Sequence, residues 1–462
     1  MNSSIPQLYE AFLAHPHVTT DSRKVEGGEI FFALKGERFD GNQYAAEVLQ
    51  KGAAAVVVDN PEVYASLPAD KAFLFDDVLT ALQQLAAHHR QQFRTWSRPI
   101  PVIGITGTNG KTTTKELTRA VLSRKYNVLA TQGNLNNQIG VPLTLLSVTP
   151  DHELAIIEMG ANHPMDIADL CAIVHPDYGL ITNVGKAHLL GFGSLEGVIA
   201  AKTELYKSLA ADGGIAFLDS FNQQLMFKAM TIGVQCRPYL PATVDDCSPY
   251  LSLSIYDSEA LDPISVQTHL IGSYNAINCQ AAATVGRFFG VPLEEVKAAI
   301  ESYEPQNMRS QLVDLGYGNQ LIMDAYNANA TSMNAALTSF NLNQAPHKSV
   351  ILGDMRELGE ESQHEHTVIL DYLFTSGIKL DIIILVGEEF TKAFKAHTAA
   401  GIAKGLDYAA SDSPTNVRCY ASVDALIADA DVLRNLAGTI LVKGSRGIQL
   451  ERAADAIKQY KC

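Results

Sequence analysis

The chain has 462 residues, of which 47% are hydrophobic and 18% charged, and its formal net charge at pH 7 is −15. A chain of this length exceeds what one hydrophobic core usually serves, so two to four domains are expected in a protein of this ordinary soluble composition. The acidic balance argues against a general nucleic-acid surface, because duplex binding depends on clustered Lys and Arg.

The sequence also contains no signal for export or membrane insertion. The N-terminal residues lack a charged segment followed by an apolar one, and no run of about 18 apolar residues occurs. The six cysteines show no C-x-x-C spacing, which is typical of free thiols. We therefore expect a reduced, cytoplasmic protein without a membrane anchor.

The first 80 or so residues predict a small α/β unit. Strands are expected at 28–34 and 53–59, with a helix at 44–51 between them. Two polar turns stand out, and each is either an ordinary surface loop or a pocket for a phosphate or nucleotide tail. The residues of interest in these turns are Ser22, Arg23, Lys35 and Gly36.

Residues 101–113 combine a short apolar strand, a glycine-punctuated turn and the start of a helix predicted to run to Tyr126. In such a layout, backbone N–H groups and the positive helix end meet phosphate oxygens, Lys111 reaches the β/γ-phosphates and Thr112 offers a hydroxyl to Mg²⁺. Ile105 stands where the usual pattern has a glycine, so the loop is a shorter variant. A tight turn between core elements is the alternative, but the Gly-Lys-Thr trio favours a nucleoside triphosphate site. The loop residues are Gly107, Thr108, Asn109, Gly110, Lys111, Thr112 and Thr113.

The central and last parts of the chain both alternate strand and helix, which predicts parallel, doubly wound sheets with ligands at the carboxyl ends of the strands. Antiparallel strands are expected between 251 and 271. We predict an α/β protein of three domains, at 1–82, 83–308 and 309–462. Strands are expected at 155–158, 178–182, 215–218, 321–323, 350–352, 382–386 and 439–442, and helices at 79–93, 165–174, 195–209, 276–289 and 448–458.

Three side chains of the central segment are candidates for metal or phosphate chemistry. Glu158 closes a strand one unit after the phosphate loop, so it is either a Mg²⁺ ligand or a solvated strand-end acid. His188 follows another strand end and is either a metal or phosphate partner or a surface histidine. Lys202 occupies the missing step of the apolar stripe Leu195, Val198, Leu205, Leu209. Its ammonium either reaches water along a packed stem or is a cleft amine that can be modified.

Residues near the start of the third predicted domain are candidates for contacts with a nucleotide. Asn275, at a helix entrance, either reads a base edge or caps the helix, and capping is the simpler interpretation. Arg309 and Asp324 fit a phosphate and a ribose hydroxyl in a cleft that closes over ATP.

The sequence resembles the Mur ligases of peptidoglycan synthesis along nearly its whole length. The phosphate loop is shared with folylpolyglutamate synthases, whereas six further segments resemble the dipeptide-adding members: 133–142, 158–162, 187–194, 326–329, 353–359 and 443–446. The Glu-x-Ser-Ser-His and Asp-Asn-Pro-Arg segments of the diaminopimelate- or lysine-adding members are not found. Tyr274 and Ala330 depart from the pattern, where relatives often carry His and Pro.

The resemblance implies a monomer with three domains: an N-terminal domain for the UDP-muramoyl peptide, a central P-loop ATPase domain, and a C-terminal Rossmann-like domain that closes on ATP and binds the dipeptide. The implied reaction joins D-alanyl-D-alanine to UDP-N-acetylmuramoyl-tripeptide through an acyl phosphate, with ATP and two Mg²⁺ ions. Alternatives are another Mur-type or folylpolyglutamate-type ligase, a P-loop switch or transport ATPase, and a non-catalytic paralogue.

The resemblance also implies roles for individual residues. The implied catalytic residues are Lys111, Glu158, His188 and Lys202, and the metal ligands Thr112, Glu158, His188 and Lys202, the lysine acting as a carbamate formed with CO₂. The implied substrate contacts are Ser22, Arg23, Lys35, Gly36, Asn137, Tyr326, Asn327 and Asn329. Asn275 would contact adenine, and Arg309 and Asp324 the phosphates and ribose.

Overall fold

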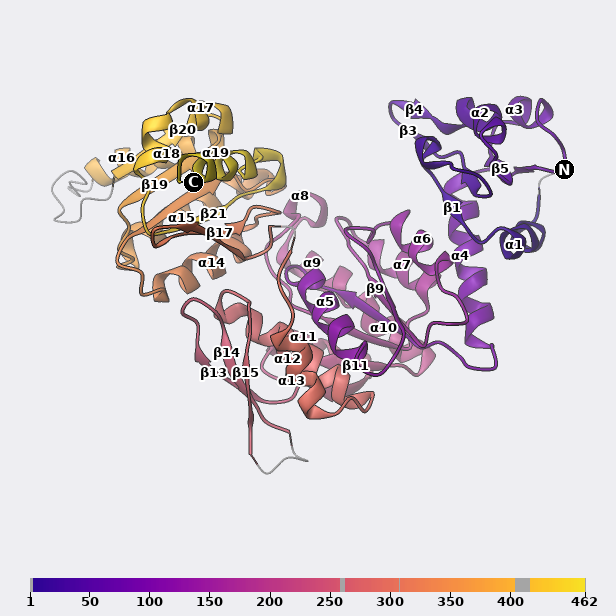
Figure 1. Ribbon diagram of the computed structural model, residues 1–462, viewed down its shortest axis with the longest axis horizontal. Helices are drawn as coiled ribbons and strands as arrows, with labels where there is room; N and C mark the ends of the chain where they lie inside the picture. Colours follow the sequence, from indigo (N-terminus) through magenta and orange to yellow (C-terminus); the bar gives the residue numbers. More distant parts are fainter. Residues whose placement is uncertain (1–2, 258–261, 307, 404–415, 462) are drawn as a thin grey trace. The chain divides into compact units, whose positions relative to one another are not determined.

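Three sheets of mainly parallel strands, each interleaved with helices, organise the chain (Figure 1). The structure, a computed structural model, describes residues 3–257, 262–306, 308–403 and 416–461. Packing divides the chain into two units. The first comprises Met1–Gly107, Leu122–Thr182 and Ala200–Pro238, and the second Thr108–Val121, Asn183–Ile199 and Tyr239–Cys462.

The first unit begins with a small sheet of four parallel strands in the order β1-β2-β5-β6. Alternate residues of β2 and β5, such as Phe31 and Val56, form its core with Val48 of α2. A separate hairpin, β3-β4, carries Lys35 and Gly36. The elements are α1 (Ile5–Ala14), β1 (Val18–Thr19), β2 (Ile30–Phe32), β3 (Lys35–Gly36), β4 (Phe39–Asp40), α2 (Ala45–Gln50), β5 (Ala55–Val58), α3 (Pro61–Ala65) and β6 (Ala72–Leu74).

Helix α4 (Val78–Arg94) connects this sheet to the central one. The side chain of Asp77 accepts a hydrogen bond from the Thr80 amide and so caps the helix start. Its apolar residues recur every three or four positions, which buries one face. Within that face Arg90 is fully buried and donates to the carbonyls of Val174 and His175 and to Asp177.

The central sheet has six parallel strands in the order β12-β11-β10-β7-β9-β8. All residues of β7 and β9 are buried, as expected for parallel strands covered on both faces. The elements are β7 (Val102–Thr106), β8 (Val128–Ala130), α6 (Gly140–Leu146), β9 (Leu154–Glu158), α7 (Asp166–Val174), β10 (Tyr178–Ile181), α10 (Glu204–Asp212), β11 (Ile215–Leu218), α11 (Gln223–Ile232) and β12 (Gln235–Pro238).

The single helix predicted over 195–209 is wrong. The structure has α9 (Leu195–Lys202) and α10, separated at Thr203. The Thr203 hydroxyl donates to the Ala200 carbonyl, a local bond that competes with the helical pattern. Lys202 therefore lies at the end of a helix rather than in its middle.

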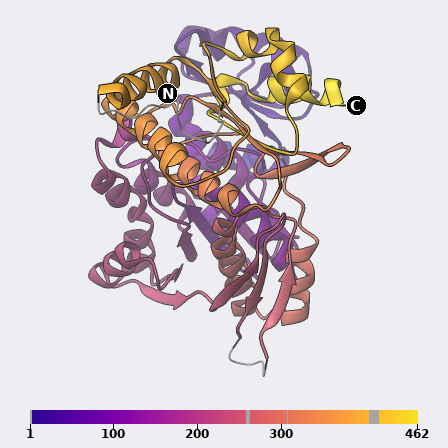
Figure 2. The same ribbon diagram turned by 90° about the vertical axis from the view of Figure 1, so that its left-hand side faces the viewer.

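The second unit contains α5 up to Val121, α8, the first residues of α9 up to Ile199, a narrow antiparallel sheet β13-β14-β15 and the C-terminal sheet. The narrow sheet is pink in Figure 2, and α13 packs against β15. The antiparallel strands predicted between 251 and 271 are confirmed. The elements are α5 (Lys111–Leu122), α8 (Leu189–Phe192), β13 (Ala242–Asp246), β14 (Ser252–Ile255), β15 (Ile264–Gln267), α12 (Ala276–Phe288) and α13 (Leu293–Glu301).

The C-terminal sheet has the order β16-β17-β21-β18-β19-β20, parallel except for the β16-β17 hairpin. Residues from α17 to α19 form a core with one face of the sheet, while α14, α15 and α16 pack side by side (Figures 1 and 2). The elements are β16 (Gln311–Gly316), β17 (Asn319–Asp324), α14 (Ala330–Leu342), β18 (Lys348–Gly353), α15 (Ser362–Thr375), β19 (Ile382–Val386), α16 (Glu388–Ala403), β20 (Asn416–Tyr420), α17 (Val423–Ala428), α18 (Ala430–Asn435), β21 (Thr439–Lys443) and α19 (Glu451–Lys461).

The predicted three-domain α/β class is confirmed, but two helix boundaries are wrong. The helix predicted from residue 448 begins at Glu451, because Gln449 has a left-handed backbone (φ 60°) and 446–448 forms a 3₁₀ turn. Helix α5 ends at Leu122 rather than at Tyr126. The domain boundaries at 82 and 308 stay predictions.

Candidate functional site

The predicted glycine turn lies between β7 and α5, and two of its residues require glycine. Gly107 has φ +143°, and a Cβ there would collide with the Thr182 hydroxyl. Gly110 has φ +79°, and a Cβ would lie 2.8 Å from Oδ1 of Asn278. Only glycine fits both backbone conformations and both close approaches.

In the second unit, the turn is hydrogen-bonded to the segment that follows β10. The Thr108 amide donates to the Asn183 carbonyl (2.9 Å), and the Asn109 amide donates to Asn183 Oδ1 (3.0 Å). Asn183 Nδ2 returns a bond to the Asn109 carbonyl, and the Gly185 amide donates to the Thr108 hydroxyl, both at 3.0 Å. These reciprocal bonds give the turn a fixed shape. Sequence reasoning missed Asn183, because no local pattern pairs it with the turn.

Helix α5 begins at Lys111 and has twelve residues, so its first-turn amides form a positive end. Lys111 Nζ donates to the Thr108 carbonyl (3.1 Å), and Lys111, Thr112 and Thr113 are partly exposed. This arrangement of amides, hydroxyls and an ammonium fits a polyphosphate chain.

Glu158 ends β9 in the first unit and is only 1% exposed, so the interpretation as a solvated acid is wrong. Its Oε1 accepts a hydrogen bond from Asn136 Nδ2 (2.8 Å), and its amide donates to the Thr131 hydroxyl (2.9 Å). The Gly160 amide donates to the Asn136 carbonyl (2.7 Å), which anchors that asparagine at the strand end. Asn136 was not predicted as a site residue, although it belongs to the distinctive segment 133–142.

Lys202 lies at the same strand end. It is 2% exposed, and its Nζ lies 3.4 Å from the carbonyl of Ala161, three residues beyond Glu158. The interpretation in which its head reaches water is therefore wrong, and the interpretation as a cleft amine that can be modified stays a prediction. Asn137, predicted to bind substrate, is exposed and accepts hydrogen bonds from the amides of Ile139 and Gly140 at the start of α6.

His188, in the second unit, has a left-handed backbone (φ 51°) and precedes α8. Its Nδ1 pairs with Oε2 of Glu357 at 2.5 Å, and the Leu190 amide donates to the Glu357 carbonyl. A carboxylate on one ring nitrogen fixes the orientation of the imidazole, as behind many metal-bound histidines. Sequence reasoning missed this partner.

The structure changes the interpretation of Asn275. Its side chain does not cap α12; Nδ2 donates to the Ile271 carbonyl, and Oδ1 accepts from Asn278. Asn278 in turn accepts from the Thr114 hydroxyl of α5 (3.0 Å). The neighbouring Tyr274 hydroxyl bonds to Ser310 Oγ, and burial raises the pKa of that phenol.

The C-terminal sheet brings several predicted residues together at the carboxyl ends of its strands. Arg309 lies over the Tyr326 ring, 3.8 Å from its centroid, and Arg446 lies 5.4 Å from the same centroid. Asp324 pairs with the buried Lys443 (2.6 Å), whose Nζ also lies 3.4 Å from the Asn327 carbonyl.

Asn329 is the N-cap of α14, with a capping box completed by Ser332. Its Nδ2 also donates to Oδ1 of Asn109 in the glycine turn (2.8 Å). A residue predicted to bind substrate therefore contacts the predicted phosphate loop within the second unit. Ala330 occupies the first position of α14 without disturbing this cap.

The two N-terminal turns each hold a cation beside an acid. Arg23 Nη2 lies 2.8 Å from Asp21, and this hydrogen bond lowers the pKa of Asp21 to about 2. The Arg23 side chain is 87% exposed, and Ser22 begins the same 3₁₀ turn. Lys35 pairs with Asp59 (2.8 Å), and hairpin residue Gly36 is exposed.

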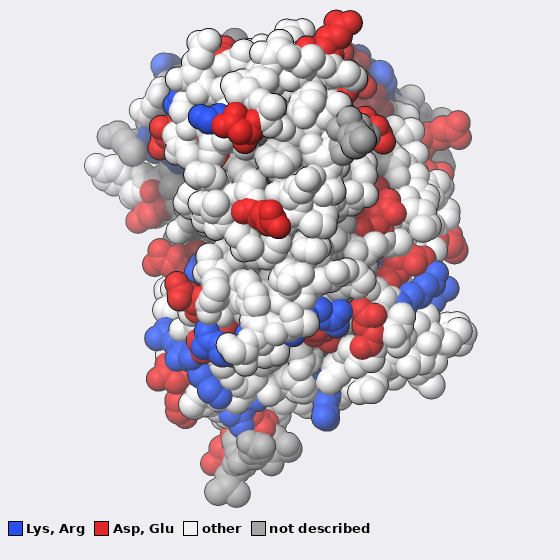
Figure 3. Space-filling model, turned by 90° about the vertical axis from the view of Figure 1, so that its right-hand side faces the viewer, with Lys and Arg blue, Asp and Glu red and all other residues white. Residues whose placement is uncertain are grey.

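On the face shown in Figure 3, Lys and Arg side chains lie interspersed with Asp and Glu. Among the helices of the described segments, none combines the length and apolar character needed to cross a bilayer.

Three family descriptions match consecutive parts of the chain: Mur ligase family, catalytic domain (residues 16–90), Mur ligase middle domain (105–286), and Mur ligase, glutamate ligase domain (308–446). The UDP-N-acetylmuramoyl-tripeptide–D-alanyl-D-alanine ligase of Escherichia coli K12 is 35% identical over 98% of this chain and 96% of its own.

Solved structures of MurF ligases share the fold of this chain. Crystal structure I of MurF from Acinetobacter baumannii superposes with a TM-score of 0.81 at 30% identity, covering 96% of this chain and 93% of that one. The MurF ligase from Thermotoga maritima in complex with ADP shares the fold, with a TM-score of 0.80 at 24% identity over 97% and 98% of the two chains.

Proposed function

Because this chain belongs to the Mur ligase family, we infer that it is an ATP-dependent ligase that joins D-alanyl-D-alanine to UDP-N-acetylmuramoyl-tripeptide. The glycine turn of 107–110, followed by Lys111 at the start of α5, is the observation that supports the dependence on ATP. Its reciprocal hydrogen bonds to Asn183 hold it ready for a polyphosphate.

The reaction makes an amide and releases ADP and phosphate. A carboxylate of the tripeptide attacks the γ-phosphorus, which gives an acyl phosphate and ADP. The dipeptide amine then adds to the acyl carbon, loses its proton and expels phosphate. Two anions meet in the first step, so positive charge such as that of Lys111 must screen the carboxylate from the triphosphate.

We propose that Thr112, Glu158, His188 and Lys202 serve two Mg²⁺ ions, with Lys202 acting as a carbamate formed with CO₂. The donors suit a hard cation: a buried carboxylate oriented by Asn136, a hydroxyl, and an imidazole oriented by Glu357. A carbamate would turn the buried Lys202 ammonium into a pair of anionic oxygens. The ions would supply Lewis-acid stabilisation of phosphate charge.

We assign substrate contacts by domain. The N-terminal turns with Ser22, Arg23, Lys35 and Gly36, together with Asn137, would hold the UDP-muramoyl peptide, since exposed cations suit a diphosphate. Asn275 would contact adenine, and Arg309 and Asp324 the phosphates and ribose. Tyr326, Asn327 and Asn329 would hold the dipeptide. The corresponding domains are 1–82, 83–308 and 309–462, in a monomeric cytoplasmic enzyme.

The decisive test is phosphate release from ATP with UDP-N-acetylmuramoyl-tripeptide and D-alanyl-D-alanine, dropping each component in turn. Release should require all three, and the product should contain the pentapeptide by mass spectrometry. Turnover that responds to another amine would indicate a different ligase of the family. Turnover of ATP alone, at the same rate as with all substrates, would indicate a switch or transport ATPase.

A further inference from the structure

Lys186 lies in the segment between β10 and α8, directly after the residues that bond the phosphate loop. Gly185 donates to the Thr108 hydroxyl, and His188 follows two residues after Lys186. The position of Lys186 therefore fixes where this segment, and the turn bonded to it, lies within the second unit.

Lys186 is bound to α14 and α15 through both its backbone and its side chain. Its amide donates to the Thr331 hydroxyl (3.1 Å), and its Nζ donates to Oε1 of Glu365 (2.6 Å). The contact is close, since a Cβ on Gly185 would lie 2.7 Å from the Thr331 hydroxyl oxygen. Asn329 at the start of α14 also donates to Asn109 of the glycine turn. The Lys186 contacts are therefore a second polar connection between the phosphate-loop region and the helices α14 and α15.

Glu365 is the unusual member of the pair, because its carboxylate is buried. It is 3% exposed, whereas the Lys186 side chain is 46% exposed. A buried carboxylate without a cation is strongly disfavoured. Among the ion pairs of the described residues, Glu365 has Lys186 as its partner. Lys186 therefore supplies the positive charge that the buried Glu365 carboxylate requires.

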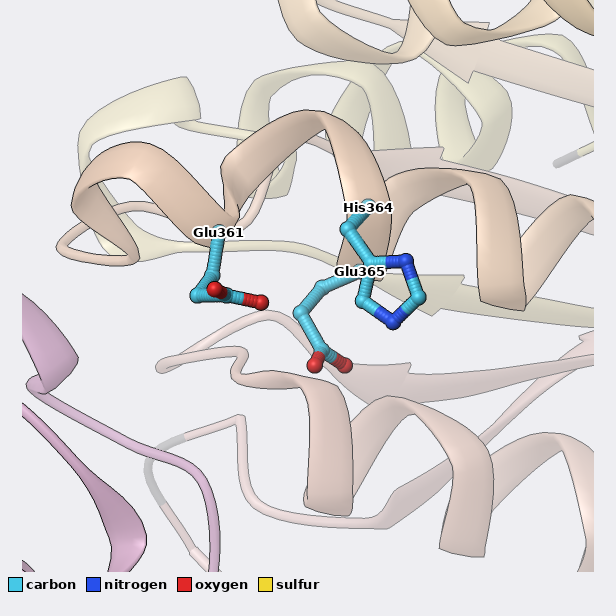
Figure 4. A group of neighbouring side chains, drawn as sticks. All are labelled: Glu361, His364 and Glu365. Carbon is cyan, nitrogen blue, oxygen red and sulfur yellow. The ribbon is translucent and has the colours of Figure 1, made fainter.

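Glu365 also faces Glu361 and His364 at the start of α15 (Figure 4), with their potential ligand atoms within 4.8 Å of one another. These two neighbours are exposed, and the Glu365 oxygen is already bonded to Lys186. The group is therefore better explained as an acidic cluster that binds the Lys186 ammonium than as a metal site.

We propose that Lys186 and Glu365 form a positioning pair for the ligation reaction. The pair holds the segment 183–188, and through it the phosphate loop, in register with the first turn of α14, where Asn329 lies. This inference rests on the proposed function, because register between the two regions matters only if the acyl phosphate formed at the phosphate loop reacts with a dipeptide held near α14.

The test is a double-mutant cycle with K186M, E365Q and the combined variant, measured as kcat/KM for D-alanyl-D-alanine. Each single variant should lose about tenfold or more, as expected for a hydrogen bond between charged groups. The combined variant should lose no more than the worse single one, because the pair acts as a unit. The matched control is K207M, which removes an ion pair of the same length, 2.6 Å to Glu204 within α10, where the Lys207 side chain is 57% exposed, and should leave kcat/KM unchanged.

Amide hydrogen exchange provides a readout that does not depend on turnover. In K186M and E365Q, without substrates, the amides of 183–188 should exchange faster than in the wild type, while those of α4 should not. Wild-type kcat/KM in both single variants, or losses that multiply in the combined variant, would overturn the proposal. Unchanged exchange at 183–188 would also overturn it. Should the wild type fail to ligate at all, the proposed function is wrong, and the exchange result still decides whether the pair holds the segment.

Discussion

Under the Mg²⁺ role proposed for Glu158, replacing Asn136 with Ala should weaken metal binding without removing a proposed ligand. Asn136 Nδ2 donates to the buried Glu158 carboxylate at 2.8 Å, so the substitution frees a charged oxygen from its orienting partner. A hydrogen bond to a charged group contributes about 1.5–3 kcal/mol, which corresponds to roughly 10- to 100-fold in an equilibrium constant. The same range is typical for partners of metal ligands.

We therefore expect the Mg²⁺ concentration for half-maximal ligation to rise about 10- to 100-fold in Asn136→Ala, with kcat largely recovered at saturating Mg²⁺. Phosphate release measured over a Mg²⁺ series gives both quantities. The control is Asn127→Ala, because Asn127 is exposed and its Nδ2 donates to the Asp151 carbonyl, away from the strand end. An unchanged Mg²⁺ dependence in a correctly folded Asn136→Ala protein would refute the assignment of Glu158 as a metal ligand.

Three other predictions concern buried or paired charges. Lys202→Ala should lose about 10²-fold or more in kcat and be partly restored by formate or acetate; full activity without additives would exclude the carbamate. Arg90→Met should cost about 2–5 kcal/mol of unfolding free energy in urea, because it takes the buried donor away from the carbonyls of Val174 and His175, while Asp177 keeps Arg94 as a partner. Arg98→Met at an exposed pair should cost less than about 1 kcal/mol. Hydrogen bonds from Lys392 and Gln363 lower the pKa of Glu389 to about 2, so this carboxylate stabilises the fold above its unfolded value near 4.5, and the stabilisation is lost as pH falls toward 2. Glu389→Gln should therefore show a shallower loss of thermal midpoint between pH 4.5 and 2 than the wild type, and identical slopes would contradict this reasoning.

Local sequence patterns predicted the buried strands and the phosphate loop, because each of these features is encoded by a few consecutive residues. The buried strands β7 and β9 are continuous apolar runs, and the Gly-Lys-Thr trio directly follows one of them. Strand β12 has no such signal, because all four of its residues are exposed at the sheet's edge. The break at Thr203 depends on a hydroxyl bond that spacing alone does not reveal.

The candidate site was predicted less completely than the fold. Local patterns proposed the charged candidates, but the hydrogen-bond partners Asn136, Asn183 and Glu357 come from other segments. The glycine turn and Asn183, for example, are 74 positions apart. Such contacts depend on the three-dimensional arrangement of strand ends, which periodicity does not encode. The burial of Glu158 and Lys202 likewise follows from packing around them, and their sequence neighbourhoods left two interpretations open.

The hydrogen bonds between the glycine turn and Asn183 affect the thermodynamics of nucleotide capture. A mobile backbone loses about 1–2 kcal/mol of conformational freedom for each residue that becomes ordered. Here Thr108 and Asn109 are held by four hydrogen bonds with the protein's own segment 183–185. These two residues are therefore ordered when the chain folds. The affinity for ATP is not reduced by the entropy cost of ordering them.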